Sequence, residues 1–204
     1  MTSLLQETPV PLPFVKTRVR VAFLDDDAQF LDALATTLSG LNAQFFTRQR
    51  DLDEALAHTH AARQADKSLL NSLSEPDVFN RLARVFGYLE NPGRSAIFQI
   101  IVVDHMMPGE RGRDYCSRHR GDGVFRILLT GAADESLAVE AFNSGDIDYF
   151  VPKQTRGLRS KLSSVLDEVQ LRLHADISER MRAIADPEAM AALNTSSAQR
   201  DLRT

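Results

Sequence analysis

The feature that most constrains the fold of this chain is an apolar run, Ile100-Ile101-Val102-Val103, that ends on a single carboxylate, Asp104. Four consecutive β-branched residues cannot alternate between a buried and an exposed face, so they predict a strand covered on both faces, as in a parallel sheet. Open α/β sheets bind ligands at the carboxyl ends of their strands. Asp104 therefore stands where a reactive side chain would be presented, although taken alone it could equally start the Met-Pro-Gly turn that follows.

The composition predicts one principal domain in a soluble, cytoplasmic protein. A chain of 204 residues, 43% of them hydrophobic, can bury one full-sized core. A net charge of -4 without a dense run of Lys or Arg suggests no direct nucleic acid or membrane partner. The single cysteine, Cys116, excludes an intrachain disulfide and fits a reducing cytosol. No signal sequence and no bilayer-spanning apolar stretch are present.

Strand and helix patterns alternate along most of the chain, and Gly40 and Gly145 are the predicted stops of two of the helices. Asp51 is a plausible N-cap for the second helix. Strands are expected near 18–24, 43–47, 100–104, 124–130 and 149–153, with helices near 28–39, 51–56, 113–119 and 134–144. This alternation predicts an α/β fold in which a five-stranded parallel sheet carries helices on both faces.

Three stretches fall outside this alternation. Residues 58–95 read as a helical hairpin inserted between the second and third strands, whose second arm starts at Ser74 with a cap and a first-turn proline. The last helix starts near Thr155 and is too long to pack on one domain, so its distal half should protrude and pack against a second chain. The predicted divisions are an extended leader (1–17), the domain (18–164), the protruding helix (165–186) and a weakly structured tail (187–204).

Four predicted strand ends carry polar side chains: Asp25 with Asp26, then Asp104, Thr130 and Lys153. Parallel topology places all of them at one edge of the sheet. Three carboxylates in one crevice are electrostatically costly unless a divalent cation neutralises them, and oxygen ligands suit Mg²⁺ or Mn²⁺. An ammonium and a hydroxyl suit the oxygens of a phosphoryl group. Asp104 would then be a nucleophile toward phosphorus.

These residues resemble the receiver domain of bacterial two-component response regulators, over residues 18–164 without the hairpin. The resemblance implies a doubly wound, flavodoxin-like fold and a phosphoryl donor that is a sensor histidine kinase or a phosphotransfer protein. The shared residues also include Pro108 and Gly112, four and eight residues after the acceptor. The resemblance implies that Asp104 is the phosphoacceptor and that Thr130 and Lys153 contact the phosphoryl group. It implies that Mg²⁺ is bound by Asp25, Asp26, Asp104 and the backbone carbonyl of Met106. It also implies a conformational switch formed by Thr130 and Phe150, with Tyr149 as the alternative aromatic.

The chain departs from this family in three places. Gln154 follows Lys153 where the family usually has a proline, and the third helix of the alternating pattern is about one turn shorter than usual. The inserted hairpin widens the separation between Asp26 and Asp104. None of these departures removes a predicted site residue.

The leading hypothesis is a phosphorylation-dependent response regulator without its own DNA-binding output domain. It would be a phosphoacceptor with self-phosphorylation and autodephosphorylation chemistry rather than a turnover enzyme. Its output would be association with an unknown protein target, or a homodimer formed through the last helix or the hairpin. The alternative is a non-phosphorylated pseudo-receiver that acts as a dimerisation scaffold. A haloacid-dehalogenase-like phosphatase would need an aspartate at Met106.

Other polar residues have simpler interpretations. His58 and His60 could be phosphotransfer histidines only within a four-helix bundle, and His105 is expected to line the loop after the third strand. The cluster Arg111, Arg113, Arg118 and Arg120 reads as a solvated face, with docking of an acidic partner as the alternative.

Overall fold

The computed structural model describes residues 19–72, 87, 91–131 and 134–184. The predicted leader, the second arm of the hairpin and the tail lie outside these residues. The chain divides into two compact units, one comprising residues 18–61 and 95–167 and the other comprising 1–17, 62–94 and 168–204. The first of these units contains the whole sheet and every predicted site residue.

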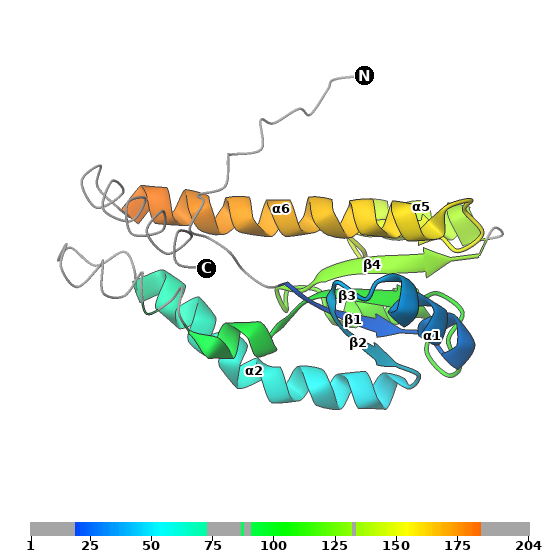
Figure 1. Ribbon diagram of the computed structural model, residues 1–204, viewed down its shortest axis with the longest axis horizontal. Coiled ribbons are helices and arrows are strands. Elements are labelled where there is room, and N and C mark those ends of the chain that lie inside the picture. The colour runs from blue at the N-terminus through cyan, green and yellow to red at the C-terminus, as the bar shows by residue number, and fades with distance from the viewer. Residues whose placement is uncertain (1–18, 73–86, 88–90, 132–133, 185–204) are drawn as a thin grey trace, which may run out of the picture. The chain divides into compact units, whose positions relative to one another are not determined.

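Strands and helices alternate along the chain, as the sequence predicts (Figure 1). The elements are β1 (Arg20–Leu24), α1 (Ala28–Thr37), β2 (Asn42–Phe46), α2 (Gln49–Ser72), the 3-10 helix η1 (Pro92–Ala96), β3 (Phe98–Asp104), α4 (Gly112–Arg118), β4 (Phe125–Thr130), α5 (Glu135–Asn143), β5 (Tyr149–Pro152) and α6 (Leu158–Ile184).

The five strands form one sheet in the order β2-β1-β3-β4-β5, and every neighbouring pair is parallel. This order is the flavodoxin-like doubly wound topology, so the predicted fold class is confirmed. After β2 the chain returns to the opposite side of β1, which makes the gap between the ends of β1 and β3 the topological switch point. Ligand sites of such sheets form there, beyond the carboxyl ends of the strands.

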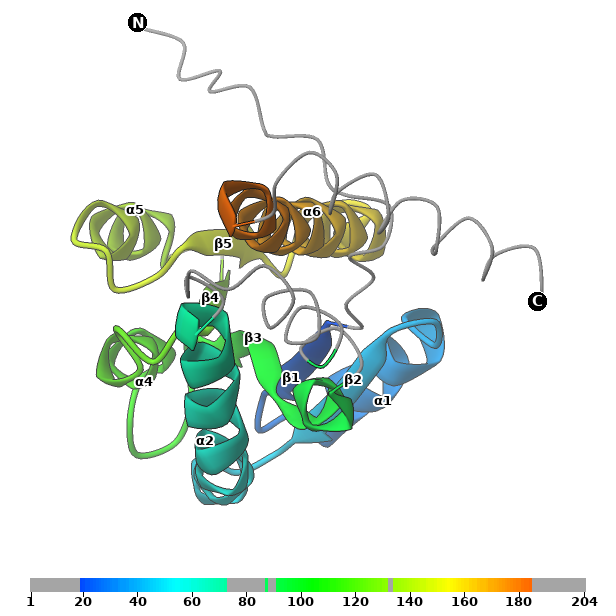
Figure 2. The same cartoon turned by 90° about the vertical axis from the view of Figure 1, so that its left-hand side faces the viewer.

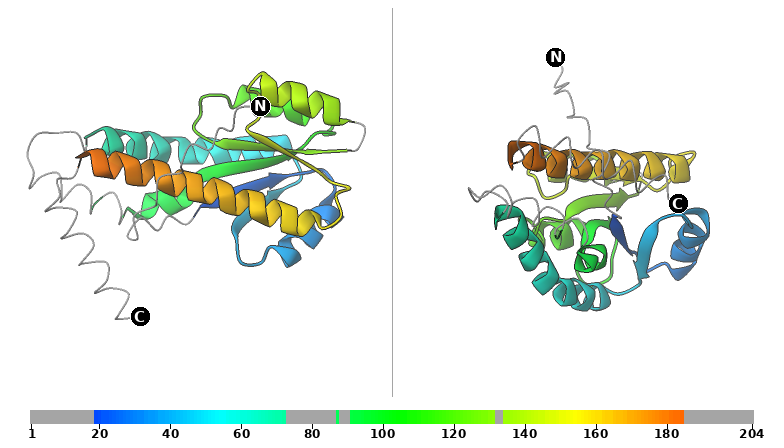
Figure 3. Two further views of the ribbon diagram at one scale, coloured as in Figure 1. Left: turned by 90° about the horizontal axis from the view of Figure 1, so that it is seen from above. Right: turned by 60° about the vertical axis from the view of Figure 1, so that its left-hand side comes forward.

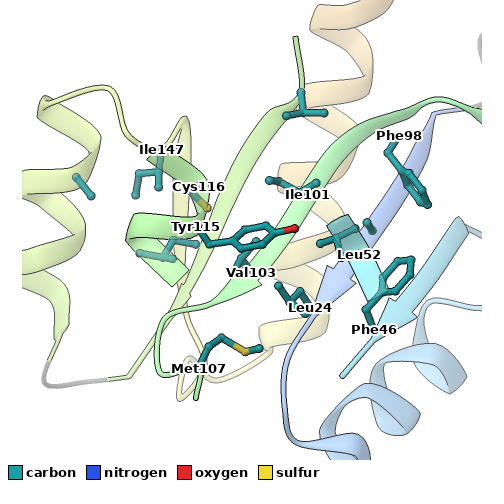
Figure 4. Close-up of a cluster of buried hydrophobic side chains, with 14 residues drawn as sticks. Leu24, Phe46, Leu52, Phe98, Ile101, Val103, Met107, Tyr115, Cys116 and Ile147 are labelled. Carbon is teal, nitrogen blue, oxygen red and sulfur yellow. The ribbon is translucent and has the colours of Figure 1, made fainter. Parts of the chain in front are cut away.

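Helices cover both faces of the sheet within this unit (Figures 2 and 3). The first half of α2 lies with α4 and α5 on one face, and α1 lies with the first half of α6 on the other (Figure 2). Ile100 to Val103 are completely buried because both of their faces are covered, as predicted. Leu52 and Tyr115, also fully buried, bring α2 and α4 onto Ile101 and Val103 (Figure 4).

Two predicted helix boundaries are displaced for local reasons. α1 ends at Thr37 rather than near Gly40, and the Thr37 hydroxyl bonds back to the carbonyls of Ala33 and Leu34, which competes with continuation of the helix. α2 begins at Gln49, so Asp51 is not its N-cap; it lies in the first turn, 2.8 Å from the Arg48 guanidinium.

The end of α5 follows the prediction. Gly145 adopts a positive φ of 73°, and the N–H groups of Gly145 and Asp146 donate to the carbonyls of Phe142 and Ala141. This pair of bonds is the Schellman motif, which suits glycine because a side chain disfavours positive φ.

The two long helices each run from the sheet-bearing unit into the other unit. α2 continues without interruption to Ser72, so the first arm of the predicted hairpin is helical. α6 starts at Leu158, after a turn with Gly157 at φ 74°, and passes residue 164 without a break. Pairing of its distal half with a second chain stays a prediction. Among the described helices, none combines the length and apolarity that crossing a bilayer requires.

Candidate functional site

The carboxyl-terminal edge of the sheet carries the four predicted polar positions. Asp25 follows β1, Asp104 is the last residue of β3, Thr130 is the last residue of β4, and Lys153 follows β5. Because all strands are parallel, these ends meet at the same edge, as the sequence predicts.

Lys153 joins two of the acids at this edge. Its Nζ lies 2.6 Å from Oδ2 of Asp25 and 2.9 Å from Oδ1 of Asp104. The side chain of Asp25 is 1% exposed and that of Asp104 is 7% exposed, whereas that of Lys153 keeps 21%. One partly exposed ammonium therefore bridges two buried carboxylates that come from strands on either side of the switch point.

Asp26 adds a third carboxylate to the same cluster. Asp25, Asp26 and Asp104 each offer one oxygen, and these oxygens lie within 4.8 Å of one another. Asp26 is exposed, so the cluster opens to solvent on its side. Three carboxylates against one ammonium leave net negative charge, and an all-oxygen donor set with an open side suits a hard divalent cation that keeps some of its water.

The pKa values of Asp25 and Lys153 show the cost of this arrangement. Burial raises the pKa of Asp25 above its ordinary value, although the Lys153 ammonium and the Asp27 N–H oppose the shift. Burial by itself would lower the pKa of the Lys153 ammonium. Its hydrogen bonds to Asp25 and Asp104 more than offset that effect, so the pKa of Lys153 lies above its ordinary value and the group stays charged.

The three aspartates that follow β1, residues 25 to 27, have different structural roles. The backbone N–H of Asp25 donates to the Phe46 carbonyl, which anchors the end of β1 to β2. Oδ1 of Asp25 accepts the N–H of Asp27 at 3.0 Å. Asp27 in turn caps α1, because its Oδ1 accepts the N–H groups of Gln29 and Phe30. Asp26 is left facing solvent and available to a ligand.

Phe30 is a site neighbour that sequence reasoning missed. Its ring centroid lies 4.7 Å from Nζ of Lys153, within the range of a cation–π contact. The signal that could have found it is its place in the first turn of the helix that follows the acidic strand end.

Gly112 explains part of the β3–α4 geometry. Its N–H donates to the His105 carbonyl, and a Cβ at this position would collide with the backbone carbonyl of Asp104. Only glycine allows the start of α4 to lie this close to Asp104. The side chain of Met106, two residues after Asp104, is 60% exposed. The predicted role of its backbone carbonyl stays a prediction.

Two buried polar side chains near the edge lack partners. Within the part of the chain that the structure describes, the Thr130 hydroxyl and both ring nitrogens of His105 have no hydrogen-bond partner. The expectation that His105 lines the loop after the third strand is wrong, because His105 is only 2% exposed and is therefore buried. The backbones around them are fixed, because Lys153 N–H donates to the Thr130 carbonyl and His105 N–H to the Leu129 carbonyl.

The two candidate switch aromatics lie on opposite faces of β5. Phe150 is partly buried against the cluster that contains Leu128 and Ala141, on the face that α5 covers. Tyr149 carries Lys161 of α6 over its ring, at 5.8 Å from the centroid. Thr130 and Leu128 lie two residues apart on β4, so their side chains point to the same face of the sheet. Leu128 is paired with Phe150 and Ile127 with Tyr149, so Phe150 shares the face of the Thr130 side chain and Tyr149 does not.

The predicted arginine face is largely occupied within the chain. Arg113 contacts Glu140 and Asp146, Arg118 contacts Glu110 and Asp53, and Arg120 donates to the Ser144 carbonyl. These pairs tie α4 to its neighbours, whereas Arg111 is exposed and takes part in none of the ion pairs found among the described residues. Gln154 is exposed, and Lys153 reaches both carboxylates with this residue in the place of the usual proline.

Comparison with solved structures identifies the fold. The Legionella pneumophila response regulator LqsR superposes with a TM-score of 0.57 at 22% sequence identity, covering 89% of this chain and 56% of that one. The chain thus spans little more than half the length of that protein. An uncharacterised protein from Neptuniibacter caesariensis superposes with a TM-score of 0.52 at 19% identity, covering 76% of this chain and 89% of that one.

This chain has the response-regulator receiver fold. The receiver fold thus accounts for the strand order and for the edge at which the acids and Lys153 meet. Comparison with protein-family models finds no matching family, and comparison with curated proteins finds no matching relative.

Proposed function

We propose that this chain is a two-component response regulator that accepts a phosphoryl group on Asp104. The observation that carries the proposal is the bridge from Lys153 to Asp25 and Asp104, with the carboxylate of Asp26 in the same cluster. A structural role alone does not require three carboxylates around one ammonium at a switch point, because that surplus of negative charge costs stability.

The transfer step uses the nucleophilicity of Asp104. A carboxylate oxygen of Asp104 attacks the phosphorus of a phosphohistidine in a sensor histidine kinase or phosphotransfer protein. The new O–P bond forms as the P–N bond breaks, and the departing imidazole keeps the electron pair and takes up a proton. Lys153 then pairs with a phosphoryl oxygen, for which its ammonium is already 2.9 Å from Asp104.

Asp25, Asp26, Asp104 and the backbone carbonyl of Met106 would hold Mg²⁺, or Mn²⁺ in its place. When bound, the cation neutralises the carboxylates and the phosphoryl oxygens. Asp26 is exposed, so a cation could enter from its side, and the Asp104 carboxylate would then be both a ligand and the acceptor.

Thr130 is the proposed link between phosphorylation and a change of shape. Its hydroxyl is buried and, among the described residues, has no hydrogen-bond partner, so donation to a phosphoryl oxygen would satisfy it. Movement of Thr130 toward the phosphoryl group leaves space on the face that it shares with Phe150. Phe150 is therefore the proposed switch aromatic, and Tyr149 is disfavoured because it lies on the other face.

The proposed output is association with another protein, or between two copies of this chain through α6 or the hairpin at residues 58–95. The switch would act on such surfaces through the α5 side of β5, where Phe150 packs.

Mass spectrometry tests the transfer directly. The protein is incubated with acetyl phosphate and Mg²⁺ and its intact mass is measured, with Asp104→Asn as the test variant. Asp32→Asn, an exposed aspartate on α1, is the matched control. We expect one phosphoryl adduct in the parent and in Asp32→Asn, and none in Asp104→Asn or with EDTA. No adduct in the parent, or an equal adduct in Asp104→Asn, would reject the proposal, and the first result would favour the scaffold alternative.

A further inference from the structure

The ring of Phe30 is the one aromatic group that the described structure places over the Lys153 ammonium, at 4.7 Å from its centroid. A cation over an aromatic face is attracted by the negative face of the ring, and the attraction grows when the pair is partly desolvated. Lys153 is only 21% exposed on its side chain, so this condition is met.

The position of Phe30 follows from the same acidic run that forms the site. Asp25 accepts the N–H of Asp27, and Asp27 accepts the N–H of Phe30. Lys153 in turn contacts both the Phe30 ring and the Asp25 carboxylate. The first turn of α1 is thereby fixed to the end of β5 through the site itself.

Lys153 needs such a support because of its own flexibility. A lysine side chain has four rotatable bonds and loses considerable rotamer freedom when it is held in one place. It stands at the end of β5, followed by Gln154, which is exposed. The Phe30 ring gives this ammonium a third contact beside the carboxylates of Asp25 and Asp104.

We infer that Phe30 is a positioning residue that holds the Lys153 ammonium ready for the incoming phosphoryl group. This inference rests on the proposed function. Phe30 acts through Lys153 and contacts no reacting atom, so the position of the ammonium is the property it controls.

The test measures that position directly. The chain has four lysines, so labelling with lysine enriched in ¹³C at Cε gives few NMR signals. The Cε protons of Lys153 should be shifted upfield by the Phe30 ring. The variants are Phe30→Leu, which removes the ring, and Phe30→Tyr, which restores one. Phe142→Leu, at a half-exposed phenylalanine on α5, is the matched control for loss of an aromatic side chain. Lys161 over Tyr149 serves as an internal reference signal.

The expected result is loss of the upfield shift in Phe30→Leu alone, with the Lys161 signal unchanged in every variant. Loading of Asp104 from acetyl phosphate at saturating Mg²⁺ should then be about three- to tenfold slower in Phe30→Leu, the range expected for loss of one cation–π contact. Phe30→Tyr and Phe142→Leu should load at the parent rate.

Two outcomes overturn the inference. A Lys153 signal that is equal in the parent and Phe30→Leu means that the ring does not hold the ammonium. A lost shift with an unchanged loading rate means that the contact does not serve the transfer. If the parent does not load at all, the proposed function fails, and the NMR comparison still decides whether Phe30 positions Lys153.

Discussion

Two groups of charges in this fold are built in opposite ways. The first is the carboxylate edge, formed by Asp25, Asp26, Asp104 and Lys153. The second, which we name the arginine network, comprises two sets of ion pairs, one joining Arg113 to Glu140 and Asp146 and the other joining Arg126 to Asp148. Both contain more carboxylates than cations, yet only the network satisfies its acids.

The arginine network gives its carboxylates several donors each. Asp148 accepts two guanidinium bonds and one backbone bond from Arg126. Asp146 accepts bonds from Ser144, Ser117 and Arg113. At the carboxylate edge, three acids share a single ammonium. Carboxylates with several donors each stabilise the fold, whereas the edge keeps unmet negative charge that a cation can use.

The largest expected effect comes from removing one cation from each group. Lys153→Met should lower the free energy of unfolding by about 3 kcal/mol in EDTA, because two buried carboxylates lose their shared partner. Arg126→Met should cost about 2 kcal/mol, since Asp148 is 31% exposed and can turn to water. Urea denaturation near neutral pH measures both.

Excess Mg²⁺ then separates the two variants. Measured against the parent under the same conditions, it should narrow the stability deficit of Lys153→Met by about 1 to 2 kcal/mol, because a bound cation replaces the missing charge, and leave the deficit of Arg126→Met unchanged. Equal restoration of both variants, or of neither, would remove the distinction between the edge and the network.

Asp26 should matter only when a cation is bound. Its carboxylate is exposed and is involved in none of the ion pairs found among the described residues, so Asp26→Asn should unfold like the parent in EDTA. Saturating Mg²⁺ should raise the stability of the parent by about 1 to 3 kcal/mol and leave Asp26→Asn nearly unchanged. Thermal unfolding with and without Mg²⁺ gives the comparison, and an equal rise in both proteins would count against Asp26 as a ligand.

The arginine network should respond to acid through Asp146. The hydrogen bond from Ser144, with those from Ser117 and Arg113, lowers the pKa of the Asp146 carboxyl in the folded protein. A lowered folded pKa contributes stability that is complete above the unfolded value of about 3.9 and is lost as the pH falls through the folded pKa. The stability difference between the parent and Asp146→Asn should therefore stay constant at higher pH and shrink below about pH 4. A difference that grows on acidification would contradict the assignment.

The smallest expected effect is a change in the reaction rate of Cys116, which is buried in the packing of α4. Cys116 of α4 is fully buried, and burial raises the pKa of its thiol. The thiolate is the reactive form, so a disulfide reagent should modify Cys116 only as fast as the protein opens. Arg126→Met should speed this reaction more than Lys153→Met assayed with Mg²⁺. Rapid modification of the parent would show that this packing is loose.

The sequence predicts the edge better than the network, for a physical reason. A strand end is a local event, so the run from Ile100 to Asp104 and the stops at Thr130 and Lys153 could be located from their neighbours alone. The pairing of Arg126 with Asp148 joins residues 22 apart and follows from how β4 and β5 pack, which no local pattern encodes.

The contacts around the site were hidden for the same reason. Phe30 lies in the helix that the sequence predicts at 28–39, but its place over Lys153 depends on how α1 packs beside the end of β5, which no local pattern encodes. Local competition explains the smaller errors, such as the early end of α1 at its two threonines and the start of α2 two residues before Asp51.

The most direct test of the central claim is to locate the modified residue. After incubation with acetyl phosphate and Mg²⁺, borohydride reduces an aspartyl phosphate to homoserine, and peptide mass spectrometry identifies its position. Our account predicts homoserine at residue 104 alone, with none in samples treated with EDTA. Homoserine at Asp25 or Asp26, or its absence from residue 104, would contradict the assignment of Asp104 as the acceptor.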